Sequence, residues 1–118
     1  MTKQNQKFTI AQSGAVTSIH CDVPSGWEQW YLHVSDCHFD SVYCNREVMK
    51  QHFDEAARRK ARICIYGDFF DAMQGRFDPR RSMAELRPEY RRDDYYDYVV
   101  DDAAAWLADY SPMIDLLS

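Results

Sequence analysis

The sequence predicts an α/β fold with a βαβ core and flanking helices. Residues 29–35 are rich in the aromatic and β-branched side chains that strands favour. Residues 46–60 repeat apolar side chains with the period of a helix, and residues 61–66 are a short apolar run of the kind found in buried strands. This order of strand, helix and strand predicts two parallel strands joined by a crossover helix.

Size and composition fit a single folded domain spanning residues 1–118. Hydrophobic residues make up 46% of the chain and charged residues 28%, which is the balance of a globular protein and not of a disordered one. No apolar stretch approaches the roughly 18 residues that a membrane span needs, and the N-terminus lacks the apolar core of a signal peptide. We therefore expect a cytoplasmic protein with no membrane partner.

The N-terminal part predicts two short strands, at 7–11 and 15–23, around a Gln-Ser-Gly turn. Pro24, Ser25 and Gly26 then interrupt the chain before the strand at 29–35.

The crossover helix is predicted to begin after Asn45, a residue type that commonly caps helix N-termini. Its apolar face is expected to be Val48, Met49, His52, Phe53, Ala56 and Ala57.

The C-terminal part predicts a long functional loop, or a loop with a short helical turn, at 72–89. A second helix is predicted at 89–110, because apolar side chains recur there on one helical face and charged ones on the other. That apolar face is Tyr95, Val99, Ala103, Trp106 and Tyr110.

The four cysteines show no CxxC spacing, so reduced thiols are expected for Cys21, Cys37, Cys44 and Cys64. The formal net charge of −5 argues against an open basic surface that binds nucleic acid through phosphate contacts alone. Charge is unevenly distributed, however, because the segment from Arg76 to Arg92 holds six arginines against three acidic residues.

Two motifs follow the two strands of the predicted βαβ unit. Asp36-Cys37-His38 comes after the first strand, and Gly67-Asp68-Phe69-Phe70-Asp71 comes after the second. The carboxyl ends of parallel strands meet at one edge of a sheet, so Asp36, His38 and Asp68 are expected to converge. Two carboxylates and an imidazole suit a divalent metal, and a carboxylate can bridge two ions about 3.5–4 Å apart in hydrolytic sites.

The segments LHVSDCHFDS and ICIYGDFFDAM resemble the D-x-H and G-D-x-x-D blocks of calcineurin-like metallophosphoesterases. The resemblance implies half of that family's α/β/β/α sandwich, phosphoester hydrolysis, and a divalent metal pair such as Mn²⁺, Mg²⁺, Fe or Zn²⁺. It implies that Asp36 and His38 bind one metal, that Asp68 bridges two, and that Asp71 supports the ligands.

The family's G-N-H-[ED] and G-H-x-H blocks are absent from these residues, and no histidine follows His52. A fragment of a longer enzyme, a natural truncation, and a half-site completed by another chain or a C-terminal segment all remain open. The alternative function is a catalytically inactive domain of this type that binds a protein or nucleic-acid partner.

Other charged and aromatic groups have two interpretations each. The segment with Arg76, Arg80 and Arg81 is either a solvated loop or a clamp for substrate phosphate beside the metals. His33 is expected in the core or behind the metal ligands, and His52 is expected to pack on the helix face.

Overall fold

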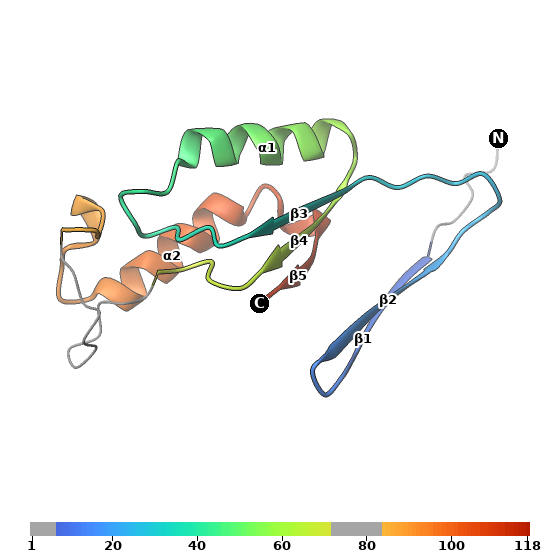
Figure 1. The fold of residues 1–118 in the computed structure, drawn as a ribbon, viewed down its shortest axis with the longest axis horizontal. Coiled ribbons are helices and arrows are strands. Elements are labelled where there is room, and N and C mark those ends of the chain that lie inside the picture. Colours follow the sequence, from blue (N-terminus) through green and yellow to red (C-terminus); the bar gives the residue numbers. More distant parts are fainter. Residues whose placement is uncertain (1–6, 72–83) are drawn as a thin grey trace.

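The computed structural model describes residues 7–71 and 84–118, which form a mixed α/β structure with two sheets and two α-helices (Figure 1). The predicted Arg76, Arg80 and Arg81 clamp lies outside the described residues. The elements are β1 (Lys7–Ser13), β2 (Val16–Asp22), β3 (Tyr31–Ser35), α1 (Arg46–Arg58), β4 (Arg62–Tyr66), α2 (Tyr95–Leu107) and β5 (Ile114–Leu117), with 3₁₀ turns at Pro88–Tyr90 and Ser111–Met113.

Strands β1 and β2 form an antiparallel hairpin, which confirms the two predicted N-terminal strands within two residues at their ends. Figure 1 shows the hairpin projecting to one side of the α/β unit. The hairpin touches that unit near its base, where the Cys21 Sγ lies 3.9 Å from the Tyr31 hydroxyl and the Arg62 guanidinium carbon lies 5.4 Å from the centroid of the Phe8 ring.

Strands β3, β4 and β5 form a parallel sheet in that order, so the predicted βαβ unit is present. Leu32 pairs with Ile63 across β3 and β4. Strand β5, which the sequence analysis missed, adds to the other side of β4 through Ile63 and Ile114. The central position of β4 explains why Ile63 and Ile65 are fully buried.

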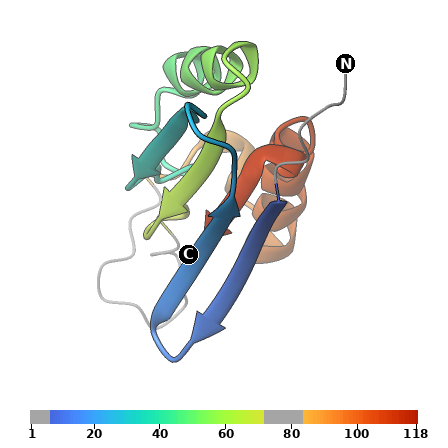
Figure 2. The same ribbon diagram turned by 90° about the vertical axis from the view of Figure 1, so that its right-hand side faces the viewer.

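Both helices pack on the same face of the parallel sheet (Figure 2). The Phe53 ring of α1 has its centroid 5.2 Å from Trp106 in α2 and 5.2 Å from Tyr110 just beyond it. These aromatic contacts join the helices above Ile63 and Ile65.

The other sheet face carries His33. This residue is exposed, so the expectation of a core position for His33 was wrong. Its Nδ1 is 2.9 Å from the Tyr66 hydroxyl, and its ring stacks beside Tyr31 at 5.9 Å and Tyr66 at 5.7 Å. On the same face Arg62 pairs with the buried carboxylate of Asp115. Polar partners for these groups explain how the face is stable without a helix over it.

Helix α1 begins where predicted, because the Asn45 side chain accepts a hydrogen bond from the backbone N–H of Val48. It buries a narrower stripe than predicted: Phe53 and Ala56 are buried, whereas His52 is exposed, so the expectation that His52 packs was wrong. The helix ends at Arg58, and Lys60 then adopts a left-handed conformation with φ 54°.

Helix α2 is shorter than the predicted 89–110. Pro88 opens a 3₁₀ turn, and a pair between Arg92 and Asp94 precedes the first helical residue, Tyr95. The predicted face is otherwise confirmed, because Val99 and the residues spaced along it are buried or partly buried. In the described part of the chain no helix has the length and apolar character needed to cross a membrane.

Candidate metal centre

Two loops leave the carboxyl ends of β3 and β4 side by side. The backbone N–H of His38 donates to the Asp68 carbonyl at 3.0 Å, and that of Phe39 donates to the Phe69 carbonyl at 2.7 Å. A longer bond of 3.3 Å joins the Asp36 N–H to the Gly67 carbonyl. The loops thus extend the pairing of the parallel strands beyond the sheet, which fixes their relative register.

Asp36, His38 and Asp68 all have left-handed backbones, with φ values of 54°, 48° and 47°. Among the non-glycine residues of the described chain, Lys60 is the only other one with positive φ. Such conformations cost of order 1–3 kcal/mol each and persist where the surrounding structure enforces them. Strain at three neighbouring polar residues, within loops tied together by hydrogen bonds, marks this edge of the sheet as a candidate functional site.

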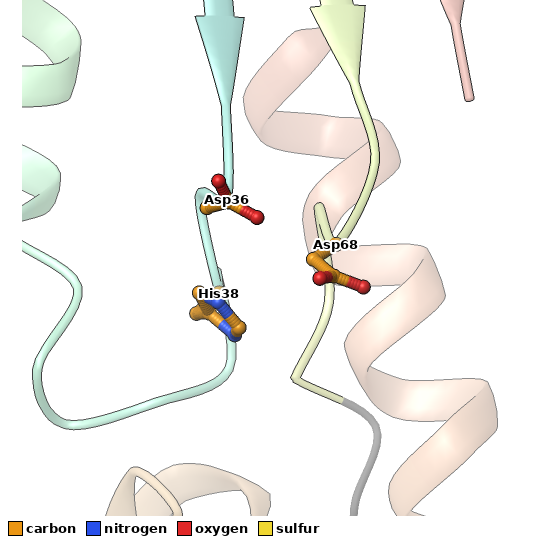
Figure 3. A group of neighbouring side chains, drawn as sticks. All are labelled: Asp36, His38 and Asp68. Carbon is orange, nitrogen blue, oxygen red and sulfur yellow. The ribbon is translucent and has the colours of Figure 1, made fainter.

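The same three side chains converge. Figure 3 shows Asp36 and His38 on the loop after β3, with Asp68 across from them on the loop after β4. One potential ligand atom from each lies within 4.8 Å of the others. Two atoms that share an ion at about 2.1 Å are at most about 4.2 Å apart, so small side-chain rotations would close the site.

The donor chemistry and accessibility also fit a metal. Two carboxylates and one imidazole suit Mn²⁺, Mg²⁺, Fe or Zn²⁺. Asp36 and Asp68 are exposed and His38 is partly buried, so an ion could enter from solvent. Across the described ranges 7–71 and 84–118, no other cluster of His, Cys, Asp or Glu brings three such atoms together.

Asp71 lies where the sequence places a supporting residue. Its Oδ1 is 3.1 Å from the Nδ1 of His38, and its side chain is only 13% exposed. An imidazole that donates its Nδ1 proton keeps the lone pair of Nε2 for a metal. Asp71 therefore orients the ring of the candidate ligand without needing to be a ligand itself.

Asp40, which is not among the predicted site residues, is completely buried two residues after His38. Its carboxylate accepts hydrogen bonds from the Asp71 backbone N–H, at 2.5 Å, and from the Tyr95 hydroxyl. Burial, followed by the hydrogen bond to Asp40, raises the pKa of Tyr95, so this hydroxyl stays protonated and remains a donor. The D-x-H-x-D spacing was visible in the sequence, but nothing in it indicated the partners of Asp40.

Two thiols line the pocket that opens beside the candidate ligands. Burial raises the pKa of Cys37 to about 11, and burial also raises the pKa of Cys44. Both therefore stay protonated at neutral pH, a form that is a poor nucleophile and a poor metal ligand. All four cysteines are free, as expected from their spacing.

In the segment from Arg76 to Arg92, the arginines that the structure describes have partners close by in the sequence. Arg87 pairs with Glu89 at 2.7 Å, Arg91 donates to the Leu86 carbonyl at 3.1 Å, and Arg92 pairs with Asp94. These contacts shape the turn before α2.

The chain matches no protein-family model, no curated protein and no solved structure.

Proposed function

We propose that Asp36, His38 and Asp68 bind a divalent metal ion and that the chain belongs to a metal-dependent phosphoester hydrolase. The observation that carries the proposal is the convergence of three potential ligand atoms within 4.8 Å, on residues that all have left-handed backbones. A divalent ion at this position would polarise a phosphoryl oxygen and lower the pKa of a bound water. The residues of the chain would hold the ion and leave one side open to substrate.

The proposal extends to the fold, which we take to be half of an α/β/β/α sandwich. The parallel sheet has α1 and α2 on one face, and the other face carries Tyr31, His33 and Tyr66, a surface that a second layer could cover. Free thiols at all four cysteines agree with a cytoplasmic location.

Ligand number sets the expected activity. Two-metal hydrolysis needs several oxygen and nitrogen ligands on each ion, and Asp36, His38 and Asp68 suffice for one ion. We therefore propose that efficient hydrolysis, with a nucleic acid or another phosphoester as substrate, requires ligands from a completing segment or chain. The 118-residue chain alone should hydrolyse bis-p-nitrophenyl phosphate with Mn²⁺ at close to the background rate. Robust turnover that is lost in Asp36→Ala would contradict the incomplete-site proposal.

Titration calorimetry with Mn²⁺ tests metal binding. We expect one site per chain, lost in Asp68→Asn because an amide is a weaker ligand than a carboxylate. Asp101→Asn is the matched control, since Asp101 is exposed on α2 and the substitution removes the same charge. Equal affinity of the two variants would remove Asp68 from the site. No heat of binding in the wild type would instead favour an inactive domain that binds a macromolecular partner.

A further inference from the structure

The buried carboxylate of Asp40 calls for a physical explanation. Asp40 is 0% exposed, whereas the candidate ligands Asp36 and Asp68 are exposed. Burying a carboxylate costs several kcal/mol unless hydrogen bonds compensate. Two of the groups that donate to Asp40 show how this buried side chain is held.

Two of its donors come from distant parts of the chain. The Tyr95 hydroxyl, from the first residue of α2, donates to Oδ2. The Asp71 N–H, from the loop after β4, donates to Oδ1 at 2.5 Å. Asp40 thus joins the start of α2 to the loop that carries Asp71.

Asp71, held by Asp40, in turn contacts the candidate metal ligand His38. Its own Oδ1 lies 3.1 Å from the Nδ1 of His38. A continuous series of hydrogen bonds therefore runs from Tyr95 through Asp40 and Asp71 to the imidazole of His38.

We propose that Asp40 and Tyr95 are positioning residues of the metal centre, which hold Asp71 so that it keeps the His38 proton on Nδ1 and leaves Nε2 for the metal. The metal part of this inference rests on the proposed function. Partners that orient a ligating histidine commonly change metal affinity by about 10–100-fold when they are removed. The proton position on His38 does not depend on a metal and can be measured without one.

Tyr95→Phe is the sharpest test, because it removes one hydroxyl and keeps the aromatic ring of a residue that is only 6% exposed. Tyr90→Phe is the matched control. Tyr90 is also buried, at 0% exposure, and its hydroxyl also donates to an aspartate, Asp102, while accepting from Arg46. Within the described residues no hydrogen bond joins Tyr90 to Asp71. If the Tyr95 hydroxyl had a purely structural role, Tyr95→Phe would lower stability, as Tyr90→Phe does, without changing the tautomer of His38.

The first measurement is the long-range ¹H–¹⁵N spectrum of the His38 ring in the metal-free full chain, at a pH where the ring is neutral. We expect the Nδ1–H tautomer in the wild type and in Tyr90→Phe, and a mixture of tautomers in Tyr95→Phe. Asp71→Ala should give the same mixture of tautomers, because it removes the carboxylate beside His38 and keeps the backbone N–H that donates to Asp40. This variant replaces Tyr95→Phe in the test if Tyr95→Phe does not fold.

The second measurement is Mn²⁺ affinity by calorimetry. We expect Kd to rise about tenfold in Tyr95→Phe and to stay within about twofold of wild type in Tyr90→Phe. Unchanged tautomer and affinity in both Tyr95→Phe and Asp71→Ala would overturn the positioning role and leave metal binding standing. If the wild type binds no Mn²⁺ but Tyr95→Phe still changes the tautomer of His38, the positioning of His38 is supported and the metal function is refuted.

Discussion

The left-handed backbone at Asp36 predicts that a substitution can abolish metal binding and yet stabilise the metal-free chain. Asp36 has φ 54°, a conformation that glycine adopts freely and that other residues adopt at a cost. Asp36→Gly should therefore stabilise the metal-free chain relative to Asp36→Ala, although both substitutions remove the same carboxylate.

The magnitude follows from two opposing contributions. Alanine in a left-handed conformation costs about 1–2 kcal/mol relative to glycine. Glycine loses more backbone entropy on folding, which returns about 0.5–1 kcal/mol to the alanine variant. The net expectation is that Asp36→Gly is more stable by about 0.5–1 kcal/mol, which corresponds to about 2–4 °C in Tm for a domain of this size. The wild type should lie between them, because aspartate tolerates this conformation better than alanine.

Urea denaturation in EDTA measures the difference without contribution from metal. Ser35, an exposed neighbour at the end of β3, supplies the control pair Ser35→Gly and Ser35→Ala. There the order should reverse, since an extended strand backbone gives glycine no advantage. Equal stability of Asp36→Ala and Asp36→Gly would contradict the left-handed conformation of Asp36, and with it the backbone strain that marks this site.

Three further predictions concern packing and charge. Phe53→Ala should lower the free energy of unfolding by about 3–5 kcal/mol, because the ring is fully buried between the helices; a loss under about 1 kcal/mol in urea denaturation would contradict that packing. Asp115→Asn should cost about 1–2 kcal/mol by the same assay, since it leaves the Arg62 guanidinium, 26% exposed, without its carboxylate; an unchanged midpoint would argue against the pair. Burial, then the hydrogen bond to Asp102, raises the pKa of Tyr90 from 10.0 to about 12, so the unfolded chain releases this proton first and stability should fall between those pH values. Denaturation at several alkaline pH values should show a shallower fall for Tyr90→Phe, and identical slopes would contradict the shift.

The local elements and the convergence of the candidate ligands could be predicted because they depend on local pattern and on one topological rule. Asn45 marks the start of α1, and strands of a βαβ unit end at one edge of their sheet. That rule places Asp36, His38 and Asp68 together without any knowledge of their side-chain contacts.

What could not be predicted depends on contacts between distant residues. Asp40 and Tyr95 are 55 positions apart, and neither lies in a pattern that indicates a partner. Strand β5 has four residues, too few for an alternation of burial to stand out. His52 is next to Phe53 in the sequence, but the buried stripe of α1 is narrow: Phe53 and Ala56 are buried, whereas His52 is exposed.

The central claim, that Asp36, His38 and Asp68 form one metal site, is tested most directly by anomalous diffraction from crystals grown with Mn²⁺. We predict one anomalous peak per chain, about 2.0–2.3 Å from a carboxylate oxygen of Asp36, a carboxylate oxygen of Asp68 and the Nε2 of His38. A map with no peak between these side chains at saturating Mn²⁺ would contradict the claim.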